Sequence, residues 1–290
     1  MTSSPHRYAR IETAAGRLDE ALLELVAPLL VEIRSGSPPP GPVFFARFRR
    51  EALVFVQDGT YPTGDAVWEL VERRAREFRQ NGIVIGCRFP EYEPEVERYG
   101  GEEGLDLAGR IFEEDSRAAL ALLGAEREGT FAATRREISL LLTERLLDLL
   151  RFDREARVSF YRFAYAWALK QGEWKDDEIR LLDDRYRQLE PGLEELLGAA
   201  RSGDAESAYG GAEPARIAAA WADAARAIVD RLLEAHGAGR IPKDLESLAW
   251  SYSHMHCNRL GIAGEAEALL RFFMHRRYEH ASEDGLPRVR

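Results

Sequence analysis

The sequence predicts an α+β protein in which a β-α-β-β-α-β half is followed by a mostly helical half. Short apolar runs typical of strands mark residues 1–104, whereas long amphipathic segments fill residues 105–290. The chain has 290 residues, 45% of them apolar, and is therefore long enough to bury a full core. We expect the two halves to form one integrated domain around a single cleft.

The first half begins with a strand, a helix and a hairpin. A short apolar run predicts a strand over residues 7–11, and leucines and alanines at helical spacing predict a helix over residues 16–34. The breaker run at residues 35–42 ends this helix. Two apolar segments, residues 43–48 and 52–56, flank a charged turn and predict a hairpin.

A second helix and a last strand complete this half. Apolar residues on one face predict a helix over residues 65–79, and Asn81-Gly82 introduces a β-rich run over residues 83–89. The resulting order, β-α-β-β-α-β, is that of a ferredoxin-like unit, an antiparallel sheet that carries both helices on one face. We therefore expect a ferredoxin-like first half.

The second half is predicted to consist of helices separated by glycines and prolines. The expected helices span residues 105–124, 130–150, 154–171, 177–199, 213–236, 244–257 and 262–279. The expected breaks lie at Gly124, Gly129, Gly172, Pro191, Gly237 and Pro242. Residues 203–213 are rich in Gly, Ala and Ser, which predicts an exposed loop.

Charge and hydropathy argue against two classes of partner. Asp and Glu outnumber Lys and Arg by 50 to 40, which gives a net charge of −10 and a pI near 5.3. An acidic surface does not neutralise phosphates, so we expect no nucleic-acid partner. The N-terminus has no apolar signal region, and no run approaches the roughly 18 apolar residues that a membrane span needs. We therefore expect a cytoplasmic protein with no membrane partner.

Cysteine and histidine spacing gives no disulfide or metal pattern. Cys87 and Cys257 are far apart and form no CxxC pair, so we expect both to be reduced and partly buried. His254 and His256 stand two residues apart and therefore point about 200° apart on a helix, which does not suit one shared metal ion. We expect no metal and no cofactor, and the oligomeric state stays open.

A polar and aromatic run follows the last predicted strand. Residues 88–101, RFPEYEPEVERYGG, alternate ionisable residues with two tyrosines and two prolines before a double glycine. Prolines stiffen the backbone, and glycines permit tight turns or the close approach of a substrate. Composition alone leaves two interpretations open: the wall of a site, or a solvated connector whose glutamates form salt bridges with neighbouring helices.

Two stretches of the sequence resemble a known family. Residues 92–101, YEPEVERYGG, and residues 107–116, LAGRIFEEDS, are similar to lantibiotic-dehydratase C-terminal domains, which include thiopeptide-type bacteriocin biosynthesis domains. The aromatic pair Phe44-Phe45 fits the same family. Residues 251–260, SYSHMHCNRL, resemble the family's His-Met-x-x-Asn-Arg-Leu helix. Two distant motifs in the right order make the resemblance specific.

The resemblance implies work on a ribosomally synthesised precursor peptide. In full-length members an N-terminal part glutamylates Ser and Thr, and the C-terminal part eliminates glutamate to leave dehydroamino acids. Since 290 residues leave no room for the N-terminal part, we expect a free-standing enzyme that acts on a glutamylated or dehydrated peptide. Two family reactions fit: glutamate elimination, and the formal 4+2 aza-cycloaddition of two dehydroalanines that forms the pyridine of thiopeptides.

One strand favours the cycloaddition. Eliminating members resemble one another in a His-Leu-Arg-Leu-Arg strand, whereas the corresponding residues here, 51–56, are EALVFV and include no cation that could pair with a carboxylate. Aligning two alkenes of one chain can contribute about 7–11 kcal/mol, so positioning supplies most of the acceleration. We therefore expect a thiopeptide pyridine synthase, a cofactor-independent enzyme that releases water and the leader peptide and closes the macrocycle.

The hypothesis places candidate catalytic residues on both halves. Tyr252, Ser253 and His254 lie on the matched C-terminal helix, and we expect them to face three residues across the cleft: Tyr92, Glu93 and Arg98. These side-chain types suit proton shuttling. The residues expected to bind the precursor peptide, its leader and dehydrated core, are Arg88, Glu95, Glu97, Trp250, His256, Asn258 and Arg259. An edge strand of the first half is a further expected site for the leader.

Other interpretations stay open beside this hypothesis. The eliminating half of a split dehydratase would release glutamate, and a non-catalytic precursor-peptide-binding protein would tolerate loss of Tyr252 and His254 together. Asn258 and Arg259 also fit structural clamps. The aromatic residues 160–167 fit core packing better than a peptide groove. The acidic clusters at residues 113–115 and 176–178 are typical of solvated faces.

Overall fold

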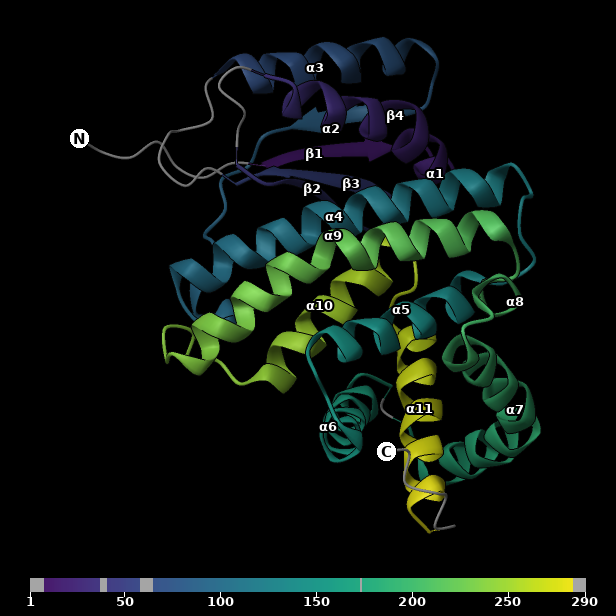
Figure 1. Ribbon diagram of the computed structural model, residues 1–290. Helices are drawn as coiled ribbons and strands as arrows, with labels where there is room; N and C mark the ends of the chain where they lie inside the picture. Colours follow the sequence, from purple (N-terminus) through teal and green to yellow (C-terminus); the bar gives the residue numbers. More distant parts are fainter. Residues whose placement is uncertain (1–7, 37–40, 58–64, 173, 284–290) are drawn as a thin grey trace. The chain divides into compact units, whose positions relative to one another are not determined.

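The computed structural model describes residues 8–36, 41–57, 65–172 and 174–283 (Figure 1). The chain forms two compact units. Unit 1 comprises Met1–Glu128 and Asp223–Lys243, and unit 2 comprises Gly129–Ala222 and Asp244–Arg290. The boundary expected between residues 104 and 105 falls inside a helix of unit 1, because that helix begins at Glu102.

A four-stranded antiparallel sheet lies in unit 1. Its strands are β1 (Tyr8–Thr13), β2 (Val43–Phe48), β3 (Glu51–Val56) and β4 (Val84–Arg88). The strand order is β2-β3-β1-β4, and each neighbouring pair is antiparallel. β2 and β3 form the predicted hairpin. The predicted α+β class, mostly helical with an antiparallel sheet near the N-terminus, is therefore confirmed.

Helices flank this sheet within unit 1. The predicted first helix is interrupted, because α1 (Leu18–Ala21) continues through the π-helical turn η1 (Leu22–Val26) into α2 (Ala27–Arg34). Figure 1 shows α2 and α3 (Asp65–Gln80) on one side of the sheet and α4 (Glu102–Arg127) on the other. α4 passes through Gly124, where a break was expected, because a single glycine weakens a helix without ending it.

Polar groups hold α4 beside β2. The backbone N–H of Phe45 donates to the hydroxyl of Ser116 at 3.2 Å, and the Gln57 amide donates to the backbone oxygen of Leu105 at 2.9 Å. Glu113 and Asp115 on α4 are buried, so the expected solvated face at residues 113–115 is wrong for both. Arg34 lies 3.2 Å from the Glu113 carboxylate and offsets its charge.

Unit 2 is helical. Its helices are α5 (Arg135–Leu149), α6 (Arg154–Gly172), α7 (Asp176–Ser202), α8 (Ala205–Tyr209), α10 (Leu245–Arg259) and α11 (Glu265–Glu283). α9 (Ala212–Gly237) begins in unit 2 and continues into unit 1 after Ala222. The seven helices predicted for the second half are therefore present, with ends that differ by a few residues.

Two local expectations in unit 2 are wrong. α7 continues through Pro191, since Tyr186 and Leu197 are buried on either side of it and hold the helix in place. The loop expected at residues 203–213 contains α8, whose Asp204 side chain accepts from the Ser207 N–H. Ala208 and Tyr209 of that helix are buried, and burial raises the pKa of Tyr209 to about 12.

The aromatic residues 160–167 divide between core and surface. Phe160 and Tyr161 are fully buried, and the Tyr161 ring stacks on Tyr278 of α11 at 5.0 Å. Phe163 is 41% exposed, and Trp167 is only partly covered. The expectation of core packing is therefore correct for the start of this stretch only.

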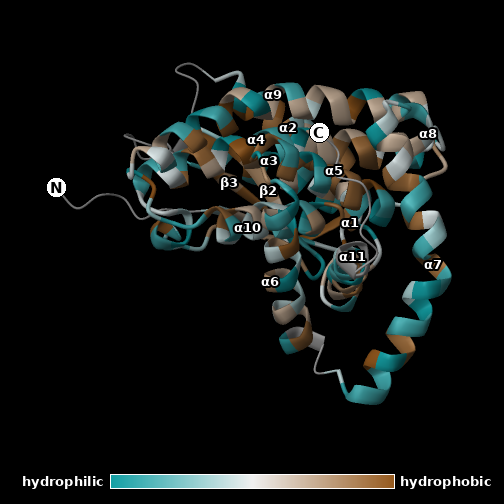
Figure 2. Cartoon of the chain, turned by 60° about the horizontal axis from the view of Figure 1, so that its bottom comes forward, coloured by the Kyte–Doolittle hydropathy of each residue, from teal (hydrophilic) through white to brown (hydrophobic). Residues whose placement is uncertain are grey.

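Hydrophilic residues predominate along α7 (Figure 2), and Asp176, Asp177 and Glu178 at its start are exposed, as expected. Over the described parts of the chain, none of the helices has both the length and the apolar character that a membrane crossing requires.

Candidate functional site

The matched segment of unit 1 alternates between solvent and protein. The glutamates Glu91, Glu93, Glu95 and Glu97 are exposed, whereas the residues between them are partly covered. A short 3-10 helix, η2 (Val96–Tyr99), ends the segment. Arg98 lies 2.9 Å from the Glu95 carboxylate, so these two proposed site residues form a local ion pair. Glu93 and Glu97 thus point outward from the segment that carries Tyr92.

An aromatic ladder across the sheet holds Tyr92. Tyr8 and Phe44 both pair with Phe55 across neighbouring strands, and their rings stack on it at 5.0 and 5.1 Å. Tyr92 packs edge-on against Phe55 at 5.5 Å and against Tyr8 at 6.0 Å. Burial and the nearby Glu95 carboxylate raise the pKa of Tyr92. Its phenol therefore stays protonated near neutral pH and is suited to donate a hydrogen bond.

The double glycine is explained by backbone geometry. Gly100 has φ +80° and ends η2, and a Cβ at this position would lie 2.8 Å from side-chain carbons of Ile241 and Lys243. Gly101 has φ +109°. Only glycine adopts both conformations without strain, so this part of the motif forms the turn into α4. The buried Tyr99 packs edge-on against Phe112 of α4 at 5.7 Å and anchors the same turn.

A carboxylate occupies the sheet where the resemblance implies cations. Glu51 at the start of β3 is 6% exposed. It accepts a hydrogen bond from Arg10 of β1 at 2.6 Å and another from Arg88 of β4 at 2.8 Å. Arg88, proposed to bind the peptide, is therefore engaged with a protein carboxylate in unit 1.

In unit 2, α10 positions the second group of candidates. The helix begins where Asp244 accepts from the Ser247 N–H at 2.7 Å. Four of its candidates are buried: Tyr252, Ser253, His256 and Arg259. The His254 side chain keeps 29% of its surface exposed, so it is the histidine of this helix that is open to a ligand.

His254 belongs to a chain of polar contacts between α10 and α11. Its Nδ1 lies 2.9 Å from Oε2 of Glu267, whose side chain has no exposed surface. Arg271 donates to Oε1 of the same carboxylate at 3.2 Å and to the Ser253 hydroxyl at 3.0 Å. Ser253 in turn donates to the backbone oxygen of Trp250 at 3.1 Å. Burial lowers the pKa of Arg271, but Cys257 and Glu267 raise it by more, so the guanidinium stays charged.

Aromatic rings surround the His254 imidazole. The Trp250 ring is parallel to it, with a centroid distance of 5.1 Å and an interplanar angle of 2°. Trp167 of α6 packs against both rings, at 5.6 Å from His254 and 5.2 Å from Trp250, and Phe163 lies edge-on to Trp250. We call Phe163, Trp167, Trp250 and His254 the aromatic panel. It offers partly exposed π faces beside one imidazole.

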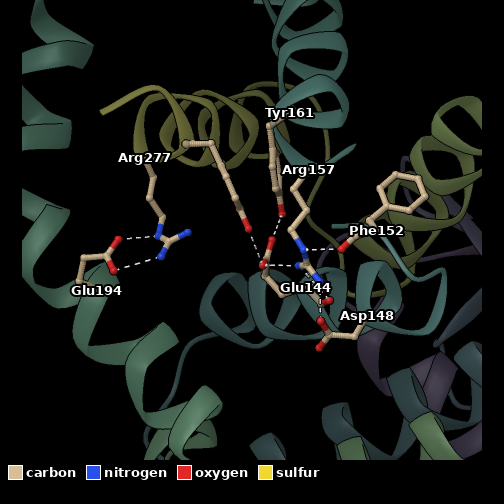
Figure 3. A network of polar contacts seen from close by, with 8 residues as sticks. Glu144, Asp148, Phe152, Arg157, Tyr161, Glu194 and Arg277 are labelled. Carbon is tan, nitrogen blue, oxygen red and sulfur yellow. Dashed lines mark hydrogen bonds and ion pairs between the residues drawn. The ribbon is translucent and has the colours of Figure 1, made fainter. Parts of the chain in front are cut away.

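In a second polar network of unit 2, protein side chains supply the hydrogen-bond partners of Glu144 (Figure 3). We call it the closed network. Glu144 of α5 accepts from the phenols of Tyr161 and Tyr278 at 2.5 and 2.9 Å and from Arg157 at 2.7 Å. Burial and the Glu144 carboxylate raise the pKa of both tyrosines. Arg157 also contacts Asp148, and Arg277 of α11 pairs separately with Glu194 of α7.

No group of three or more His, Cys, Asp or Glu side chains within the described ranges is arranged to hold a metal ion. His254 and His256 differ in exposure, as their spacing on one helix implies, because His256 is buried while His254 is partly open.

The sequence interpretation missed Glu267 and Arg271. They stand four residues apart on α11, each beside apolar residues, in the run EALLRFF. A glutamate and an arginine at this spacing share one helix face, and an apolar setting indicates that this face is buried. That pattern is the sequence signal by which the buried ion pair could have been found.

Residues 7–278 match the family described as lantibiotic biosynthesis dehydratase C-term. The chain belongs to this family. Both motifs of this lantibiotic-dehydratase C-terminal protein lie inside the match, which confirms the resemblance inferred from them. A comparison with curated protein sequences gave no match.

Solved structures share its fold. The tRNA-dependent lantibiotic dehydratase MibB from Microbispora sp. 107891 matches with a TM-score of 0.64 and 20% identity, over 99% of this chain and 29% of MibB. TsrL matches with a TM-score of 0.65 and 17% identity, over 97% of this chain and 96% of TsrL. The pyridine synthase TbtD from thiomuracin biosynthesis matches with a TM-score of 0.64 and 17% identity, over 98% of this chain and all of TbtD. The chain thus spans less than a third of MibB and nearly the whole of the other two.

Proposed function

We propose that this member of the lantibiotic-dehydratase C-terminal family is a thiopeptide pyridine synthase. One dehydroalanine and the iminol tautomer of a neighbouring amide supply four ring atoms, and a second dehydroalanine supplies two. Two C–C bonds form. The ring then loses the iminol hydroxyl as water and the leader peptide as its amide, which leaves an aromatic pyridine. These steps balance without an oxidant or reductant, so no cofactor is needed.

The observation that carries the proposal is the state of Glu51. Elimination of glutamate requires cations that bind a glutamyl carboxylate, yet β3 holds a carboxylate at this place. The neighbouring Arg10 and Arg88 already donate to Glu51 at 2.6 and 2.8 Å. A glutamyl group would have to displace a buried protein carboxylate. This supports the cycloaddition over glutamate elimination.

We assign proton transfer to side chains of both motifs. His254 takes the N–H proton of the amide as it becomes the iminol and returns this proton to a leaving group, and Tyr252 and Ser253 belong to the same proposed cluster. Tyr92, Glu93 and Arg98 of unit 1 are proposed to take part in the same reaction. The peptide-binding group in this proposal is Arg88, Glu95, Glu97, Trp250, His256, Asn258 and Arg259. The protonated phenol of Tyr92 suits donation to the developing hydroxyl.

The aromatic panel fits the reacting part of such a substrate. Two dehydroalanines and the pyridine they form are planar π systems, which stack favourably on tryptophan faces. Trp167 and Trp250 are only partly covered and lie beside the His254 ring. Stacking there would hold the alkenes close together, where positioning is worth about 7–11 kcal/mol.

We further propose that the leader peptide binds along an edge strand. At the β2 edge, the Phe45 N–H already donates to Ser116 of α4. β4 pairs with β1, and among the described residues no strand pairs with its other edge. An extended peptide could add there as a further strand. The strand order and the alternation of helices also support our proposal that this part is ferredoxin-like. We also propose that the protein is cytoplasmic.

The test uses the full chain and two synthetic peptides that share one leader. The first carries two dehydroalanines, and the second carries glutamylated serines. Mass spectrometry should show loss of water and of the leader amide from the first peptide, and no glutamate from the second. Release of glutamate without cyclisation would establish the eliminase instead. Binding of the leader with no change in mass would establish a non-catalytic carrier.

A further inference from the structure

We infer that Glu267 is a positioning residue that holds His254 with Nδ1 protonated and Nε2 free to accept a proton. Glu267 is a fully buried carboxylate of α11, the helix that follows α10, and it lies outside both motifs. The inference deepens the proposed function, because it states how the histidine of that site is prepared for proton transfer. Its structural part is independent of which reaction the chain performs.

The hydrogen-bond chain fixes the direction of each donor. An ionised carboxylate only accepts, so the 2.9 Å contact between Nδ1 of His254 and Oε2 of Glu267 requires the proton on Nδ1. Arg271 occupies the other oxygen, Oε1, at 3.2 Å, and it only donates. The cation beside a carboxylate without exposed surface offsets the cost of burying each charge.

The ring is also fixed in orientation. The parallel Trp250 ring covers one face of the imidazole, and Trp167 packs against it from α6. Nδ1 faces a carboxylate that has no exposed surface, and 29% of the His254 side chain is exposed, so Nε2 is the ring nitrogen that is not committed to Glu267. In water the Nε2–H tautomer is the commoner one, and this site therefore selects the tautomer that a general base needs.

The substitution Glu267→Gln tests this arrangement with little change in volume. Arg271 still requires an acceptor, so the new amide oxygen turns to Arg271 and the NH2 group turns to His254. That NH2 group donates to Nδ1, which then accepts, and the proton moves to Nε2. The variant should keep the fold while reversing the tautomer.

The decisive measurement is the long-range 1H–15N spectrum of the full chain with 15N-labelled histidine. Wild type should show His254 with a protonated Nδ1 and an unprotonated Nε2, and Glu267→Gln should show the reverse. The matched control is Glu279→Gln, since Glu279 lies 3.3 Å from His275 on the same helix and is half exposed. This control should leave the His254 signals unchanged. Wild-type His254 protonated at Nε2, or a Glu267→Gln variant that keeps Nδ1–H, overturns the inference.

Activity on the doubly dehydrated peptide gives the functional readout. Glu267→Gln should lower kcat by about 10²- to 10⁴-fold with little change in KM, since proton transfer at one side chain is worth about that much. Equal kcat values in the presence of a reversed tautomer would contradict the positioning role. If wild type does not cyclise the peptide, the proposed function fails while the spectrum still decides the tautomer.

A second variant keeps the inference testable if Glu267→Gln does not fold. Glu267→Asp withdraws the carboxylate by one methylene and should increase the Nε2–H population of His254 in the same spectrum. An unchanged tautomer in this variant, alongside a wild-type ring protonated at Nε2, would leave Glu267 without a role in positioning.

Discussion

Glu144 and Glu267 both accept hydrogen bonds from neighbouring helices of unit 2, yet only the network of Glu267 includes a partly exposed candidate residue, His254. The partners of Glu144 are Tyr161, Tyr278 and Arg157, each of which is largely covered by protein. Glu267 has Arg271 on one oxygen and the partly exposed His254 on the other. The first network therefore stabilises the fold. The second holds an imidazole where a substrate can contact it.

The largest expected effect on stability comes from Glu267→Leu. This change leaves the Arg271 cation buried with no carboxylate, which should lower the free energy of unfolding by about 3–5 kcal/mol. Urea denaturation followed by circular dichroism measures it. The double variant Glu267→Leu, Arg271→Met removes both charges and should recover most of the loss while cyclisation stays low. Recovery of full activity in the double variant would show that His254 needs no carboxylate.

Glu144→Gln should lower the free energy of unfolding by less than Glu267→Leu does, and it should leave the activity unchanged. The amide keeps the shape but weakens the charge-assisted bond to Arg157 and cannot accept from three donors equally well. We expect a loss of about 1–3 kcal/mol in the free energy of unfolding, with kcat near wild type under conditions where the variant is folded. A fall in kcat at unchanged stability would place Glu144 in the chemistry and remove the contrast with Glu267.

Alkaline pH should weaken the closed network. Burial and then Glu144 raise the pKa of Tyr161 and Tyr278, whereas both tyrosines titrate near about 10 in the unfolded chain. Because the folded pKa is the higher one, their contribution is fully present below pH of about 10 and is lost as the pH rises towards the folded pKa. For each tyrosine, the free energy of unfolding falls by at most about 1.4 kcal/mol per pH unit in this range. Thermal unfolding of wild type and Tyr161→Phe from pH 9 to 11 should show a shallower decline in the variant.

The smallest effect is expected at the exposed end of the same network. Asp148 pairs with Arg157, but its side chain is 55% exposed and water replaces the contact readily. Asp148→Ala should change the free energy of unfolding by less than about 1 kcal/mol in the urea experiment. A loss as large as that of Glu144→Gln would show that the network depends on its surface charge as well.

Local patterns were enough to predict most elements of the fold. The strands and the helices of both halves follow from apolar spacing, because each depends on residues close in sequence. Pro191 and the Gly-rich residues 203–213 were misjudged, since burial of Tyr186 and Tyr209 by other helices outweighed the local breakers. Glu113 and Asp115 were misjudged for the same reason: the elements packed against α4 decide their burial.

The candidate site was predicted only where a motif marks it. His254 belongs to the family helix, so the resemblance pointed to it directly. Glu267 and Arg271 lie on the next helix, and their role depends on how α11 packs against α10. In the other motif, Gly100 and Gly101 were expected to permit a turn or the close approach of a substrate, and their positive φ values confirm the turn.

Proton transfer by His254 in pyridine formation can be tested with a pair of histidine variants. His254→Phe and His275→Phe each replace a ring that stacks on an aromatic neighbour in unit 2, Trp250 and Tyr165 respectively. Release of the leader amide from the doubly dehydrated peptide should fall by about 10²- to 10⁴-fold in His254→Phe and stay near wild type in His275→Phe. Equal release by both folded variants would contradict the account.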